Sequence, residues 1–397
     1  MRLTSGAGRR GGRGWLVPGA AFIAASVVAL AGCGSSGSSS ASGSSSSGSG
    51  SATPAGVTKA NQMVAGLSAT TSTYPVPTAS VPGVSKFKGR TVYYIPLVQQ
   101  IPGFVVTAAT MKVALAKAGL KLQVCDGQGQ PSAVAACVQQ AVGAKAAGIV
   151  TDAIPYGMAG NALDAARAKG IPIVIADQIA PAGTTNGNAL SYVPGVINQP
   201  SQIAWWLIAD SKGKANAIIA EEADSPSSKQ YVTTSLPIYK QYCPGCKITV
   251  KTITATTNSL LASATSSNIL AAPDATYYYT EFEDSLQPTI QGIQQSGRTA
   301  MSLSVAGGSV NGLGLLKGNS VVKAVVAVDQ AYAGWALTDE ILRMMTKSGP
   351  VNETFPSRLF TKQNIGSIQV TPAAQATGEW FGNTSFQSAF TKLWGVG

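Results

Sequence analysis

Residues 146–178 read AAGIVTDAIPYGMAGNALDAARAKGIPIVIADQ, and this stretch decides the fold class. Two short apolar runs, residues 146–153 and 171–178, predict buried strands. Between them, residues 158–170 carry apolar side chains three and four positions apart and end in Gly170, a pattern typical of an α-helix. Two such strands joined by a helix predict a parallel pair, because a parallel connection needs a crossover.

The same rhythm of strand and helix continues on both sides of this stretch. Residues 106–119, which end in Gly119, predict another helix. The runs of strand type are 91–98, 120–126, 146–153, 171–178, 215–222, 247–255, 275–281, 300–307 and 322–330. The rhythm restarts after a loop near residues 181–188. The predicted fold class is therefore α/β, with two similar doubly wound, Rossmann-like domains and a ligand cleft between their facing strand ends.

The first 33 residues are predicted to be a lipoprotein signal peptide. Four arginines precede an apolar run at residues 15–32, which is short and soon followed by polar residues. The alternative is a membrane anchor helix. Residues 30–33, LAGC, resemble the lipobox of bacterial lipoproteins. That resemblance implies a lipid on Cys33, and a location at the extracytoplasmic face of the membrane in the cell envelope.

The segment after the signal differs from the rest of the chain in composition. Residues 34–56 are rich in Gly and Ser and predict a flexible tether. Residues 57–88 predict one short helix and then a Pro-rich connector. The chain has 28 basic and 17 acidic residues, and four of the basic ones lie in the signal, which leaves a net charge of +7. Because this excess forms no basic run, nucleic acid is not expected as a partner.

The chain contains no histidine. A Ser-His-Asp triad, a Cys-His pair, a histidine metal cluster and an imidazole base are therefore excluded. No cofactor is expected either, because residues 127–130 and 312–320 are rich in glycine but lack the spacing of a dinucleotide or phosphate loop. One enzymatic alternative stays open, in which paired carboxylates such as Glu281 and Glu283 would act without histidine.

Three segments carry a resemblance to a known family, namely residues 101–130, 146–178 and 325–342. In order and spacing they resemble the type I periplasmic substrate-binding proteins of ABC transporters, of the ribose- and galactose-binding kind. The resemblance runs from about residue 89 to 370. It implies a hinge of three crossovers, near residues 192–198, Asp329 and Arg358. The domains implied are an N-terminal one, 89–195 plus 330–357, and a C-terminal one, 196–329 plus 358–397.

Besides Cys33, the chain has Cys125, Cys137, Cys243 and Cys246. Outside the membrane an even number favours disulfides. The CPGC motif at residues 243–246 follows a helical stretch, whereas redox catalysts place this motif at a helix start, where the dipole lowers the thiol pKa. Two thiolates are also too few for a structural zinc site. The four cysteines are therefore predicted to be structural disulfides, with free thiols or a redox role as alternatives.

Candidate ligand contacts are the polar and aromatic residues at the predicted strand ends, since ligands of open α/β sheets bind there. The candidates are Gln99, Gln100, Phe104, Asp152, Tyr156, Asp177, Gln178, Asp224, Ser227, Glu281, Phe282 and Asp329. In sugar-binding members of the family, the strand similar to residues 173–178 ends in Asp followed by Arg. Here Asp177 is kept but Gln178 replaces the arginine, which favours a neutral or cationic ligand over an anionic one.

The expected function is that of a lipid-anchored receptor that captures a small molecule, a sugar or similar neutral compound, by domain closure and delivers it to an ABC permease. No reaction is expected. Two alternatives stay open: a receptor that passes the closed state to a membrane signalling protein, and a binder of an amine or aromatic compound.

Overall fold

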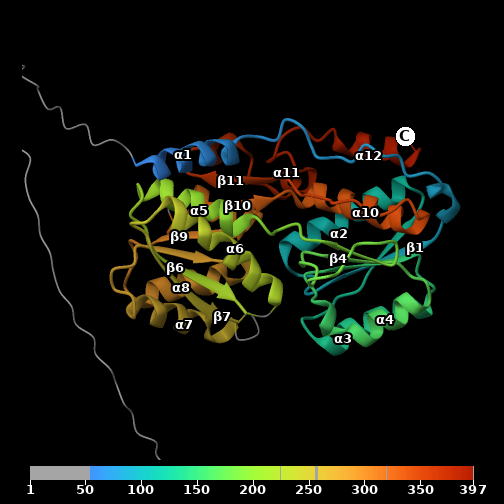
Figure 1. The fold of residues 1–397 in the computed structure, drawn as a ribbon, viewed down its shortest axis with the longest axis horizontal. Coiled ribbons are helices and arrows are strands. Elements are labelled where there is room, and N and C mark those ends of the chain that lie inside the picture. The colour runs from blue at the N-terminus through green and yellow to red at the C-terminus, as the bar shows by residue number, and fades with distance from the viewer. Residues whose placement is uncertain (1–53, 224, 255–257, 319, 397) are drawn as a thin grey trace, which may run out of the picture. The chain divides into compact units, whose positions relative to one another are not determined.

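A computed structural model of the chain describes residues 54–396, with gaps at 224, 255–257 and 319. The predicted signal peptide, most of the tether, Cys33 and Asp224 lie outside the described residues. The described part forms two lobes, each built on its own sheet (Figure 1). No helix in this part is long and apolar enough to cross a membrane.

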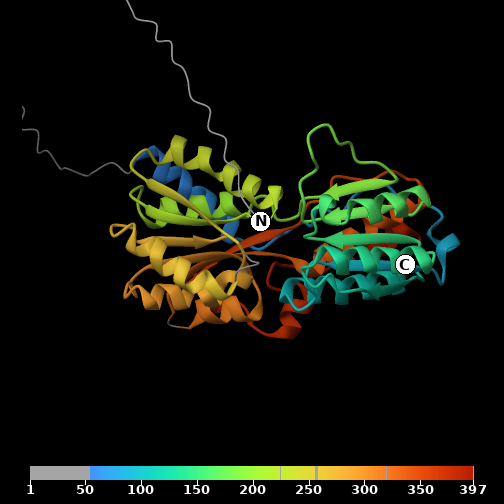
Figure 2. The same cartoon turned by 90° about the horizontal axis from the view of Figure 1, so that it is seen from below.

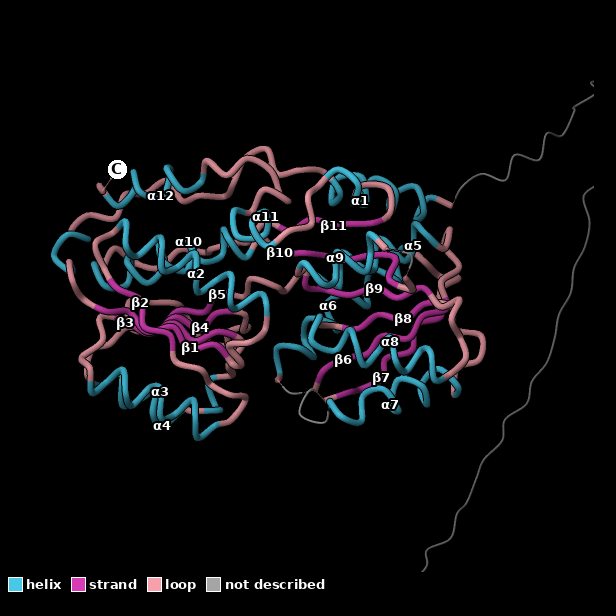
Figure 3. Tube along the Cα trace, turned by 180° about the vertical axis from the view of Figure 1, so that it is seen from behind, coloured by secondary structure: helices cyan, strands magenta, loops and turns pink. Residues whose placement is uncertain are grey.

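The first lobe is a parallel sheet of five strands in the order β2-β1-β3-β4-β5. Its strands are β1 (Thr91–Pro96), β2 (Lys121–Val124), β3 (Gly148–Asp152), β4 (Ile173–Ala176) and β5 (Leu190–Val193). Its helices are α2 (Pro102–Lys117), α3 (Pro131–Gly143), α4 (Gly160–Ala168) and α10 (Gln330–Thr346). Helices α3 and α4 cover one face, and α2 and α10 cover the other (Figure 3).

The second lobe repeats this order and adds one antiparallel edge strand, giving β11-β10-β9-β8-β6-β7. Its strands are β6 (Asn216–Glu222), β7 (Lys247–Ile253), β8 (Tyr277–Thr280), β9 (Ser302–Gly307), β10 (Val322–Val328) and β11 (Ser357–Thr361). Its helices are α1 (Ala55–Ser68), α5 (Gln199–Asp210), α6 (Pro226–Tyr242), α7 (Asn258–Leu270), α8 (Leu286–Gln295), α9 (Val310–Lys317) and α11 (Pro372–Thr377). Apolar clusters fill both faces of each sheet. Seen from below, the two lobes lie side by side (Figure 2).

The shared strand order fixes where a ligand site can form. In both lobes the chain reverses direction across the sheet at one point, between β1 and β3 in the first lobe and between β6 and β8 in the second. Ligands of open α/β sheets bind outside the carboxyl ends of the strands at such points. Asp152 ends β3 and Glu281 follows β8, so each lobe places a carboxylate there.

The close packing of α10 on the first lobe depends on small residues. A side chain at Gly334 would meet the Thr110 hydroxyl at 2.1 Å, and one at Gly148 would meet Ile341 at 2.6 Å. Without these side chains, α10 lies directly against α2 and β3. This packing joins residues 330–346 to a sheet that is more than 130 positions earlier in the chain.

The α/β fold class predicted from the sequence is confirmed, and all nine predicted strands form. Two further strands, β5 and β11, did not stand out, because each is a short edge strand of four or five residues interrupted by polar side chains. The chain passes between the lobes after β5, after β10 and before β11. It also passes along the connector after α1, which runs from the second lobe to Val81 and Val84 in the core of the first.

The C-terminal helix α12 (Phe386–Trp394) differs from the predicted domain division. Residues 358–397 were assigned to the C-terminal domain, but Phe386, Phe390 and Trp394 lie in the core of the first lobe. The Trp394 ring stacks on Trp335 of α10, with centroids 5.6 Å apart and planes 8° from parallel. The chain therefore crosses back to the first lobe at its end, because the aromatic face of α12 finds its partner on α10.

The four cysteines in the described part form two disulfides, Cys125–Cys137 and Cys243–Cys246. The first joins the end of β2 to α3. The second follows the end of α6 and precedes β7. The prediction that these cysteines are bonded is confirmed, and Cys243 is buried behind α6, away from a helix start.

Candidate functional site

The two lobes contact each other at their strand ends through α6. The Tyr231 hydroxyl of α6 donates to the Asp177 carbonyl oxygen at 2.7 Å, and the Ile179 amide donates to the Ser227 hydroxyl oxygen at 3.0 Å. Tyr231 and Ser227 are four residues apart and therefore share one face of the helix. That face lies on the loop that follows β4, so the first turns of α6 close one side of the space between the sheets.

Asp152 and Asp177 form a pair of carboxyl groups on the first lobe, of which Asp152 is buried and Asp177 is partly exposed. Oδ2 of Asp152 accepts from the Tyr94 hydroxyl at 2.6 Å. Oδ1 of each aspartate is buried and has no partner among the described residues. Neighbouring carboxylates repel each other when both are ionised, so this setting favours their protonated form.

The pKa values of both aspartates are raised. Burial raises the pKa of Asp152 to about 6, although the hydrogen bond from Tyr94 opposes the shift. Burial, followed by the charge of Asp152, raises the pKa of Asp177 well above its ordinary value. Asp177 also has a positive φ of 54°, which is uncommon outside glycine and is held by the turn after β4. Because each charge disfavours the other, the two groups take up protons at a higher pH than ordinary aspartates do.

Glu281 is the corresponding carboxyl group on the second lobe. It is only 1% exposed, its Oε2 accepts from the Glu222 amide at 2.8 Å, and its Oε1 has no partner among the described residues. Burial raises its pKa to about 9, and Glu222, Glu221 and Asp284 add to the shift by like-charge repulsion. A carboxyl group in this setting is protonated at neutral pH.

Tyr231 joins these carboxyl groups through its hydrogen bond to the Asp177 carbonyl. Burial is the main cause that raises the pKa of Tyr231, and Asp177, Glu281 and Asp152 raise it further by their charge. We call Asp152, Asp177, Glu281 and Tyr231 the interlobe site. Within the described residues, the side-chain ion pairs are Arg167–Asp164 and Arg343–Asp339, and neither belongs to this site. The interlobe site is therefore acidic, buried and without a cationic side chain bonded to it.

Several of the predicted contacts lie at the strand ends but are held by other groups. The Gln99 amide and the Gln100 side chain both donate to Asp126, while the Oε1 atom of Gln99 is buried without a partner. Phe104 is buried in the first turn of α2. The Gln178 side chain donates to the Asp177 carbonyl at 2.9 Å and so supports the turn that carries this aspartate.

Three predicted contacts have partners inside their own part of the fold. The Tyr156 hydroxyl donates to Asp164 of α4 at 2.6 Å. Asp329 caps α10, accepting from the Tyr332 amide at 3.0 Å and from the Tyr74 hydroxyl at 2.8 Å. Phe282 precedes a short 3-10 helix, 283–285, and is partly exposed. The structure brings Asp152, Asp177, Ser227 and Glu281 together, and it does not place Tyr156 or Asp329 in this group.

Glu283, suggested as half of a catalytic pair with Glu281, is occupied by the backbone. Its Oε2 accepts from the Gly308 and Ser309 amides at 2.7 Å, and its Oε1 accepts from the Gly312 amide at 2.8 Å and from the Ser309 hydroxyl. The carboxylate therefore stabilises the start of α9, where the helix dipole favours negative charge. It is not available to exchange protons with a substrate.

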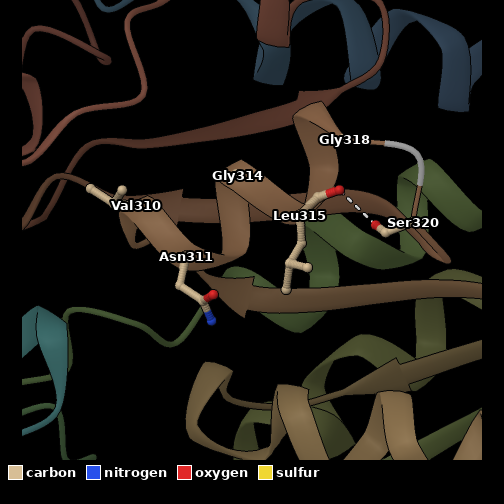
Figure 4. Close-up of a pocket in the computed structure, with 6 residues that line it drawn as sticks. All are labelled: Val310, Asn311, Gly314, Leu315, Gly318 and Ser320. Carbon is tan, nitrogen blue, oxygen red and sulfur yellow. Dashed lines mark hydrogen bonds between the residues drawn. The ribbon is translucent and has the colours of Figure 1, made fainter.

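Surface hollows lie elsewhere. A hollow of about 430 Å³ lies over α9 (Figure 4), and another of about 660 Å³ lies near Lys145, Lys169 and Lys347 at the amino ends of the first-lobe strands. The first is wide open and has no charged residue in its lining. Because ligands of this sheet type bind at the opposite, carboxyl end of the strands, we place the candidate site at the buried carboxyl groups rather than in either hollow.

Tyr94 and Tyr231 belong to the site but were not predicted from the sequence. Tyr94 lies inside β1, two residues before Pro96, which pairs with Asp152. Alternate residues of a strand share a face, so the pairing brings the Tyr94 hydroxyl to Asp152. Tyr231 lies one helical turn after Ser227. In both cases the sequence signal was the spacing from a predicted contact residue. This spacing could be interpreted only once the register of β1 with β3, or the first residue of α6, was known.

Comparison with solved structures identifies the fold. No family model and no curated protein matches the sequence. An ABC transporter solute-binding protein from Agrobacterium vitis with bound allitol is similar, with a TM-score of 0.61 and 17% identity over 71% of this chain and 98% of that one. A 5-methylthioribose transporter solute-binding protein from Thermotoga lettingae gives 0.64 and 15% identity over 79% and 99%. This chain has the type I periplasmic binding protein fold.

A periplasmic ribose ABC transporter protein from Conexibacter woesei has the same fold, with a TM-score of 0.61 and 14% identity over 76% of this chain and 99% of that one. The resemblance seen in the sequence is thereby confirmed at the level of the fold. In a periplasmic binding protein fold, the interlobe site occupies the place where two facing lobes can enclose a small molecule.

Proposed function

We propose that this protein is an extracytoplasmic receptor that captures a small molecule between its two lobes and delivers it to an ABC permease, without catalysing a reaction. The observation that supports this most directly is the group of carboxyl groups at the strand ends of both lobes, Asp152, Asp177 and Glu281, each with a buried oxygen that has no partner among the described residues. Buried polar oxygens without a partner are costly, and a ligand that donates to them would compensate that cost.

The neighbours support the same proposal through what they bind. Those described above are transport proteins, and two of them hold a polyol or a modified pentose. We infer that Cys33 carries a lipid and that residues 34–53 tether the receptor to the outer face of the membrane. The sequence supports this through the basic and apolar segment that ends in LAGC.

A thermal-shift screen would test the receptor function. The protein would be residues 52–397, a compact unit that contains both sheets, all four apolar cores and both disulfides. The ligands would be monosaccharides, polyols, amines, amino acids and small aromatics. A ligand at a thousand times its Kd adds about 4 kcal/mol to the native state, which raises the melting midpoint by several degrees. If no compound of any class raises the melting midpoint, the proposal is contradicted.

A further inference from the structure

We propose that the interlobe site takes an organic cation, a protonated amine, whose ammonium group donates to the unpartnered oxygens of its carboxyl groups. This inference rests on the proposed receptor function and names the ligand class. It starts from geometry: Asp152 ends β3, Asp177 follows β4 and Glu281 follows β8, all at the carboxyl ends of their strands. Each has a buried oxygen without a partner among the described residues.

The charges around the site favour a cation over a neutral ligand. Asp152 is 2% exposed and Glu281 is 1% exposed. The titratable groups that act on the aspartate pair are Tyr94 of β1 and the two aspartates themselves, and Tyr231 of α6 adjoins it. Those that act on Glu281 are Glu222, Glu221 and Asp284. All of these groups are acidic or phenolic, and neither ion pair of the described residues involves Asp152, Asp177 or Glu281.

A hydroxyl ligand would satisfy the orphan oxygens but would leave the buried negative charge uncompensated. An ammonium group supplies up to three donors and a full positive charge, and charge-assisted bonds to carboxylates are about twice as strong as neutral ones. Burial raises the pKa of both aspartates, so the free protein reduces the same charge by taking up a proton on the pair. An amine that enters would take the place of this proton, which passes to water.

A metal ion is a poorer fit than an organic cation. The described residues hold no group of three or more His, Cys, Asp or Glu side chains arranged to bind a metal. The carboxyl groups are also divided between the lobes, two on the first and one on the second. This arrangement suits a ligand of some length with donors directed to both sides.

The proposal predicts a link between binding and protons. Because the ligand competes with a proton on the aspartate pair, whose pKa values are raised, its affinity should rise as the pH rises from 6 to 8. Calorimetry in buffers of low and high ionisation enthalpy, phosphate and Tris, should show the release of about one proton for each amine bound at pH 7. A neutral ligand that leaves the pair protonated releases none.

Matched probes separate the ligand class from the receptor function. The pairs are glucosamine with glucose, 1,5-diaminopentane with 1,5-pentanediol, and benzylamine with benzyl alcohol, tested by thermal shift on residues 52–397. We expect at least one amine to raise the melting midpoint while its alcohol does not. An equal or larger shift from the alcohols, or a wider screen in which only neutral or anionic compounds stabilise, overturns this inference and leaves the receptor function standing. If no compound raises the melting midpoint, both the amine inference and the receptor function are overturned.

Variants of the pair complete the test. Asp177→Asn should fold normally, because an amide resembles the protonated carboxyl group, but it should weaken amine binding by about tenfold or more and abolish proton release. Asp152→Asn should also weaken amine binding and abolish proton release. Agreement between the two variants would show that the effect does not come from a change in the turn at Asp177. The matched control is Asp274→Asn, which changes an exposed aspartate before β8. Unchanged amine affinity in both site variants overturns the proposal.

Discussion

At the residue scale, the buried carboxyl groups make folding depend on pH. The pKa of Glu281 is 4.5 in an ordinary setting and about 9 here, because burial disfavours its charged form. The stabilising effect of its protonation is complete below about pH 4.5 and is lost as the pH rises toward 9. Asp152, with a folded pKa of about 6, acts in the same direction over a lower range. The unliganded protein should therefore be more stable at pH 5 than at pH 8.

Urea unfolding at both pH values, followed by tryptophan fluorescence, would measure this difference. Glu281→Gln keeps the shape of the protonated side chain and should flatten the pH dependence. Glu379→Gln changes an exposed glutamate and should leave it unaltered. Stability that rises between pH 5 and pH 8 in the native sequence would contradict the prediction.

Glu283 offers a second test, because its role is structural. Glu283→Gln removes a charge that accepts from three amides at the start of α9. Hydrogen bonds to charged groups contribute about 1.5 to 3 kcal/mol, so we expect a loss of about 2 kcal/mol in the free energy of unfolding with ligand affinity unchanged. Urea unfolding measures the first and calorimetry the second. A loss of affinity without a loss of stability would indicate that Glu283 takes part in ligand binding.

The same residues show how far sequence could predict the site. Asp152, Asp177, Ser227 and Glu281 were predicted because carboxyl ends of parallel strands meet at one edge. Asp329 satisfies that rule equally, yet its carboxylate caps α10 and binds Tyr74, which is 255 positions away in the chain. The sequence was enough to predict that each of these residues lies at a strand end. Whether a carboxyl group caps a helix or faces the other lobe depends on partners that only the fold brings together.

At the element scale, the disulfides should stabilise the fold unequally. The bond between Cys125 and Cys137 spans 12 positions and that between Cys243 and Cys246 spans three. In the chain-entropy model these loops correspond to about 3 and about 2 kcal/mol. Replacing each pair by alanine and measuring urea unfolding should show the larger loss for Cys125 and Cys137, with ligand binding retained in both. A loss of binding in the second variant would indicate a role beyond a structural one.

Helix α12 shows an element whose place the sequence did not reveal. Phe386, Phe390 and Trp394 predict an apolar helix face, but nothing in their spacing tells which lobe they cover. The answer lies in the aromatic cluster with Trp335 and Tyr332 on α10. Phe390→Ala should therefore destabilise the first lobe by about 3 to 5 kcal/mol, as measured by urea unfolding. The same substitution at Phe87, which is only partly buried, should cost less.

At the scale of the whole molecule, the two lobes share one strand order, which the sequence already indicated by restarting its rhythm near residues 181–188. That repetition predicted the fold, because each half can form its own hydrophobic core and helices must cover both faces of a parallel sheet. It did not predict how firmly the lobes meet. Helix α11 of the second lobe packs on α2 and α10 of the first, and α6 adds the hydrogen bonds of Tyr231 and Ser227. These contacts depend on the relative position of the lobes rather than on either half.

Closure of the lobes should accordingly be sensitive to two hydrogen bonds. Tyr231→Phe removes the donor to the Asp177 carbonyl, and Ser227→Ala removes the acceptor for the Ile179 amide. With each bond contributing about 1 kcal/mol, the double variant should shift the equilibrium toward open lobes by about tenfold or more. Small-angle scattering of the unliganded protein should give a larger radius of gyration than the native sequence. The matched control is Tyr277→Phe, whose hydroxyl donates to Asp210 at 2.9 Å within the second lobe. If the control opens the molecule as much as the double variant does, the contacts at α6 do not hold the lobes together.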